Sequence, residues 1–85
     1  MRTIINVPDY DPAVGLPLEW DDDFEILVQR DGHQVTITAN AAGLRSLARH
    51  LLALAQQTVP AHSHLHFDSS NSLEEGSVEL IVERV

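Results

Sequence analysis

The 85-residue chain contains neither cysteine nor lysine, and its four glycines stand apart from one another. Without cysteine there is no disulfide scaffold, no cysteine zinc site and no thiol catalysis, and a reducing compartment suits such a chain. Isolated glycines form no phosphate-binding loop, and no serine lies in the G-x-S-x-G turn of a hydrolase. The first residues lack the apolar run of a secretory signal, and no apolar run is long enough to span a membrane. These absences favour a non-enzymatic protein of the cytoplasm.

The formal net charge of −8 is concentrated at the two ends of the chain. Residues 1–23 hold six acidic side chains against one arginine, and residues 68–85 hold five against one. Residues 24–67 hold two acidic side chains against three arginines. Phosphate backbones repel such a surface, so we expect no nucleic-acid binding. A basic protein partner is the better electrostatic match, although acidic residues also serve solubility alone.

Alternating hydrophobic residues predict two β-hairpins. Residues 24–30 and 34–39 alternate on either side of Asp31-Gly32, a strong two-residue turn signal. Residues 62–67 and 78–83 alternate on either side of a serine-rich loop. We expect one face of each hairpin to belong to the core.

The segment between the hairpins has helical periodicity over residues 41–57, with Asn40 as its N-cap. All of its leucines and two of its alanines fall on one broad stripe, which we expect to cover the sheet. This stripe consists of Leu44, Leu47, Ala48, Leu51, Leu52, Leu54 and Ala55. Ser46 and His50 fall on the opposite side, which we expect to face solvent.

The resulting order, β-β-α-β-β, predicts an α+β fold: a two-layer sandwich of a mostly antiparallel sheet with one helix on one face. Residues 24–85 form a single domain, since the chain is too short for two. Residues 1–23 are interrupted by prolines and form an N-terminal arm, with a short strand favoured near residues 3–7. Trp20 is expected to anchor this arm to the core. These patterns leave open the strand order and whether the protein is a monomer or a homodimer.

The second hairpin carries a row of histidines and a row of carboxylates. His62, His64 and His66 recur at every second residue, as do Glu79 and Glu83 around an isoleucine, so both rows share the face that points away from the core. We expect His66 to lie opposite Glu79 and His62 opposite Glu83. Histidines spaced in this way can bind one zinc ion with a glutamate as a further ligand. A solvated row of paired polar groups is the simpler interpretation, and no cofactor is expected.

Two short motifs carry a resemblance to a known family. H-x-H-x-D occurs at His64, His66 and Asp68, and L-x-x-G-S-x-E-L-I runs from Leu73 to Ile81, after the leucine-rich helix segment. In this order, residues 24–85 resemble the small bacterial immunity proteins of polymorphic toxin systems, specifically the immunity protein 32 group. Residues 1–20 lie outside the resemblance.

The resemblance implies a stoichiometric inhibitor that binds a cognate toxin domain in the producing cell and blocks it without catalysis. The acidic run before the first strand and the His/Glu face of the second hairpin are the expected contact regions. Their residues are Asp21, Asp22, Asp23, His62, His64, His66, Glu79 and Glu83. Two alternatives remain: a metal-binding or pH-responsive module built on the three histidines, and a dimerising structural domain.

Overall fold

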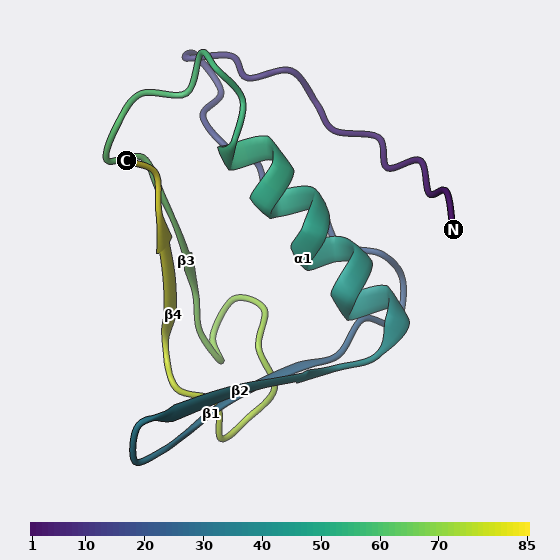
Figure 1. The fold of residues 1–85 in the computed structure, drawn as a ribbon, viewed down its shortest axis with the longest axis vertical. Helices are drawn as coiled ribbons and strands as arrows, with labels where there is room; N and C mark the ends of the chain where they lie inside the picture. The colour runs from purple at the N-terminus through teal and green to yellow at the C-terminus, as the bar shows by residue number, and fades with distance from the viewer.

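A computed structural model of residues 1–85 confirms the α+β class and the predicted order of elements (Figure 1). The elements are β1 (Ile26–Asp31), β2 (Gln34–Ala39), α1 (Ala41–Leu54), β3 (His64–Phe67) and β4 (Leu80–Glu83). The strands pair as two antiparallel hairpins, β1 with β2 and β3 with β4, and each hairpin is a separate two-stranded sheet. The β1–β2 hairpin lies across the bottom of the molecule, and α1 and the β3–β4 hairpin stand side by side above it (Figure 1).

The free edge of β1 is covered by the loop that leads into β4. The amide of Glu74 donates to the carbonyl of Ile26 at 2.8 Å, and the amide of Val78 donates to the carbonyl of Val28 at 2.9 Å. The hydroxyl of Ser77 accepts the amide of Val28 at 3.1 Å. Residues 74–78 therefore run along β1 before the chain turns into β4, which joins the two hairpins at an angle instead of in one continuous sheet.

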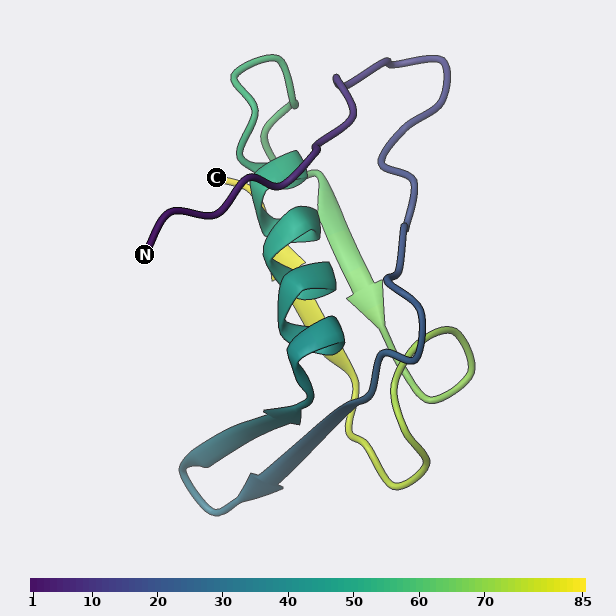
Figure 2. The ribbon, with the colours of Figure 1, turned by 90° about the vertical axis from the view of Figure 1, so that its right-hand side faces the viewer.

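β2 is exposed, although its pattern predicts a hydrophobic face in the core. Ile26 and Val28 of β1 are buried, whereas Val35 and Ile37 of β2 are 61% and 41% exposed. The prediction for residues 34–39 is therefore wrong at these two positions. The reason is the position of the hairpin, which projects from the lower end of the molecule so that only the end of β2 next to α1 approaches the rest of the chain (Figure 2).

β3 and β4 pair two residues away from the predicted register. His64 lies opposite Glu83, and His66 lies opposite Ile81 instead of Glu79. The predicted register assumed a loop centred between the two strands. In the structure, residues 74–78 of this loop are hydrogen-bonded along β1, so the loop is not symmetric. A shift of two residues keeps every side chain on its predicted face. The inward-facing hydrophobic residues of β3 are accordingly buried.

Asn40 caps α1 as predicted and also ties the helix to the first hairpin. Its Oδ1 accepts the amides of Gly43 at 2.8 Å and of Glu25 at 3.0 Å. Gly43 lies where α1 touches the beginning of β1, and a Cβ at this position would clash with the carbonyl oxygen of Glu25 and the side chain of Ile26. Glycine is therefore required for this close approach. The helix ends at Leu54, so it is shorter than predicted and too short to cross a lipid bilayer.

The side of α1 that faces the core is not the side that carries most of its leucines. Ser46 and His50, which we expected to face solvent, are almost completely buried. Leu44, Leu51 and Leu52, which we expected in the core, are 54%, 41% and 50% exposed. The predicted orientation of the helix is therefore wrong for these five residues.

The N-terminal arm accounts for this orientation. The arm lacks regular strands, so its backbone amides must find acceptors elsewhere. The amide of Glu19 donates to Nε2 of His50 at 2.9 Å, and the amide of Asp21 donates to Oγ of Ser46 at 2.8 Å. The polar side of α1 therefore faces the arm, and part of the leucine stripe is left toward solvent.

Trp20 anchors the arm to the core, as predicted, while residues 3–7 form no strand. The indole stacks on Phe24 with ring centroids 4.5 Å apart. It meets His50 and Phe67 edge-on at 4.3 and 5.7 Å. The buried hydrophobic cluster beneath it consists of Ile26, Val28, Leu54, Val59, Leu65, Phe67 and Leu73.

Candidate functional site

The outer face of β3–β4 displays the predicted row of polar side chains, all of them exposed. Nδ1 of His62 lies 3.6 Å from Oε2 of Glu83, and Nε2 of His66 lies 3.6 Å from Oε2 of Glu79. The two expected pairs therefore form, but as diagonal contacts, because the register is shifted by two residues. His64 has no carboxylate partner, and its Nδ1 lies 3.4 Å from the carbonyl oxygen of His62.

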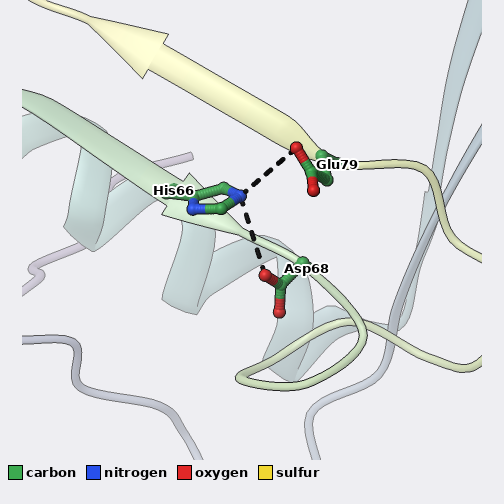
Figure 3. A group of neighbouring side chains, drawn as sticks. All are labelled: His66, Asp68 and Glu79. Carbon is green, nitrogen blue, oxygen red and sulfur yellow. Dashed lines mark ion pairs between the residues drawn. The ribbon is translucent and has the colours of Figure 1, made fainter.

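The structure brings His66 together with two carboxylates instead of with the other two histidines (Figure 3). Its Nε2 lies 3.6 Å from both Oδ2 of Asp68 and Oε2 of Glu79, and the three donor atoms lie within 4.8 Å of one another. Oδ1 of Asp68 accepts the amides of Ser70 and Asn71, which leaves Oδ2 turned toward the imidazole. One imidazole and two carboxylates could hold a zinc ion, with water completing the coordination.

The three aspartates of the acidic run 21–23 lie in different environments. Oδ1 of Asp21 lies 2.9 Å from Nη2 of Arg49, and Oδ2 lies 3.3 Å from Nε of Arg45. Hydrogen bonding to Arg49 holds the pKa of Asp21 below its usual value. This carboxylate thus joins the arm to α1, whereas Asp22 and Asp23 are exposed.

His50 is a buried histidine that the sequence pattern placed in solvent. Burial lowers its pKa, and the positive charge of Arg49 lowers that pKa further. Because Nε2 accepts the amide of Glu19, the proton of the neutral ring is on Nδ1, which has no hydrogen-bond partner in the protein. His50 therefore holds the arm in place only while it is neutral.

β2 and α1 expose hydrophobic residues that the sequence pattern assigned to the core. We call these residues together the leucine surface: Val35, Ile37, Leu44, Leu51 and Leu52. A groove of about 260 Å³ continues this surface between α1 and β4. It is lined by Leu51, Leu54, Ala55, Val82, Glu83, Arg84 and Val85.

Comparison with known protein families matches residues 34–85 to the family described as Immunity protein 32. The matched range contains β2, α1, β3 and β4, and it covers more than half of the chain. The chain belongs to this immunity protein family. The resemblance carried by the two motifs is thereby confirmed, with a match that begins at Gln34. Comparisons with curated proteins and with solved structures gave no match.

In this immunity-family protein, several residues of the two motifs build the loop between β3 and β4. The carbonyl of Asp68 accepts the amide of Leu73 at 2.8 Å and closes the first turn of the loop. Leu73 is buried in the hydrophobic cluster, and Ser77 bonds to β1. Gly76 has a φ of 91°, which side-chain-bearing residues rarely adopt. The motifs therefore identify the family mainly through residues that fold the loop.

Proposed function

We propose that this immunity-family protein binds a cognate bacterial toxin domain in the cytoplasm of the producing cell and neutralises it stoichiometrically, without catalysis. The observation that carries this proposal is the family match over residues 34–85. The exposed hydrophobic side chains on β2 and α1 support it, because a surface of this kind marks a site of protein association.

A basic toxin is the partner that the charge distribution favours. The formal net charge is −8, and exposed carboxylates lie on the arm, on the loop before β4 and on the outer face of β4. We propose Asp22, Asp23 and the His/Glu face as outer contacts that attract this partner. Charge steering of this kind accelerates association and weakens as salt screens the field over about 8–10 Å.

The test uses the toxin domain encoded beside the gene for this chain, expressed in bacteria with and without the immunity-family protein. We expect co-expression to restore growth, and light scattering after gel filtration to show a one-to-one complex. The association rate should fall as salt rises, and Asp22→Asn/Asp23→Asn should reduce that salt dependence. Growth that stays arrested despite normal amounts of the folded protein contradicts the proposal, as does an adjacent gene without a toxin domain.

A second candidate function, metal binding, is favoured by the cluster of His66, Asp68 and Glu79. Calorimetric titration with zinc should show one binding event per chain that is lost in His66→Ala. His64→Ala is the matched control, because His64 lies on the same exposed face without a carboxylate partner. The absence of measurable zinc binding to the wild-type protein removes this candidate and leaves the toxin-binding proposal untouched.

A further inference from the structure

We infer that the leucine surface is the docking site, and that an extended segment of a cationic toxin domain adds a strand to the free edge of β2 there. This inference rests on the proposed function and specifies where the toxin binds. It also names what the toxin presents, which is an exposed strand with hydrophobic residues facing α1 and basic residues around them. Strand addition to a sheet edge is a recurring mode of protein recognition.

The backbone of β2 has an unpaired edge. The carbonyls of Ile26 and Val28 bond to residues 74–78, so they point away from β2. In an antiparallel pair, the N–H and C=O groups of two directly opposite residues either point toward each other and bond, or both point away from the partner strand. Ala39 and Ile37, which lie opposite Ile26 and Val28, therefore point theirs away from β1. Since β2 pairs with no other strand, these groups are available to a partner.

β2 also lacks the features that normally protect an edge strand. Such strands are usually kept from pairing by charged side chains, proline or a bulge. The sequence of β2, QVTITA, contains no charge and no proline, and its ladder with β1 runs without a bulge from Asp31↔Gln34 to Ile26↔Ala39. Val35 and Ile37 share the face of the buried residues Ile26 and Val28. This edge is therefore chemically suited to pairing.

Leu44 and Leu51 are 54% and 41% exposed on α1, which begins two residues after the end of β2. Asp21 of the arm contacts Arg45 and Arg49, whereas Leu51 lines the groove toward β4. Leu44 precedes Leu51 by two helical turns and lies on the same side of α1. A strand that pairs with β2 along its length would therefore end next to the first turn of α1, where Leu44 is exposed.

Charge distinguishes a cationic partner from a second copy of the chain. No acidic residue occurs between positions 32 and 67, so the centre of the surface has no negative charge. Glu25, Glu74 and Glu75 line a hollow of about 300 Å³. Leu27 and Thr38 line it as well, so it lies on the face of the β1–β2 hairpin that points away from the leucine surface. A surface without acidic residues at its centre, on a chain with a formal net charge of −8, suits a cationic partner. A second copy carries the same net charge of −8, which opposes self-association.

The test measures binding of the toxin domain encoded beside the gene by calorimetry. Ile37→Glu and Leu51→Glu each place a charge in the surface, and we expect each to weaken binding about 30-fold or more, as for a central interface residue. Val35→Pro removes one outward-pointing amide of β2 and should also weaken binding. The matched control is Val14→Glu, because Val14 is an exposed hydrophobic residue in the Asp11–Gly15 turn of the arm, outside both the leucine surface and the His/Glu face, and binding should change less than twofold.

Each outcome supports or overturns the inference. Circular dichroism confirms that each variant is folded, and Leu44→Glu replaces Ile37→Glu if the latter does not fold. If Ile37→Glu and Leu51→Glu bind the toxin domain with wild-type affinity while Asp22→Asn/Asp23→Asn binds it more weakly, the inference is wrong and the proposed function stands. If the wild-type protein does not bind the toxin domain, both the inference and the proposed function are wrong. Sedimentation showing a wild-type dimer that Ile37→Glu dissociates identifies a second copy as the occupant and overturns the inference.

Discussion

Replacing Leu52 by alanine should have little effect on stability, whereas the same change at Leu54 should have a large one. The two residues are two positions apart on α1, and both belong to the stripe that the helical period assigns to the core. Leu52 is 50% exposed and Leu54 is 4% exposed. The pair therefore tests directly which side of the helix faces inward.

The expected magnitudes follow from these exposed fractions. Complete burial of a leucine side chain contributes about 1.5–3 kcal/mol, so half of that is about 1 kcal/mol at Leu52. Water fills the space left by a truncated side chain at the surface, and alanine is a somewhat better helix former than leucine, so the net cost should be at most about 1 kcal/mol. At Leu54 the truncation leaves a cavity, and the expected cost is about 2–5 kcal/mol.

Urea unfolding followed by circular dichroism measures both variants under identical conditions, and Leu44→Ala provides a second exposed position. The free energy of unfolding of Leu44→Ala and Leu52→Ala should lie within about 1 kcal/mol of wild type, with an unchanged slope against urea. If either variant loses as much stability as Leu54→Ala, the leucine stripe faces the core as the period suggests. The leucines of α1 would then not be exposed, and the docking inference, which depends on their exposure, would be wrong.

Two further perturbations test the contacts of α1. Because the pKa of His50 is lowered on folding, the unfolded chain binds more protons below its own pKa of about 6.5, and stability should fall as the pH drops through that value. His50→Gln should flatten this dependence in unfolding measurements between pH 7.5 and 5, and identical profiles would contradict it. Gly43→Ala gains about 1 kcal/mol of helix propensity, but crowding against Glu25 and Ile26 costs about 1–3 kcal/mol, so a net loss of thermal stability is expected. A more stable variant would show that α1 does not approach β1 closely.

Only part of the candidate site could be predicted from the sequence. The strand period placed the histidines and glutamates on one exposed face correctly, because a two-residue repeat is a local property. It did not bring Asp68 to His66, since that contact depends on the turn that follows β3. The loop between β3 and β4 pairs with β1, a strand about 50 positions earlier in the chain, and no local pattern encodes that register.

For α1, the sequence by itself determined where the helix begins and which residues share each side. Asn40 provides the cap, and the helical period separates the leucines from Ser46 and His50. Only the tertiary structure decided which of these sides faces inward. The arm is an irregular segment whose backbone amides need acceptors, and the side chains of Ser46 and His50 supply them. The sequence periods therefore determine the elements and their faces, while long-range hydrogen bonding decides that several leucines of α1 are exposed.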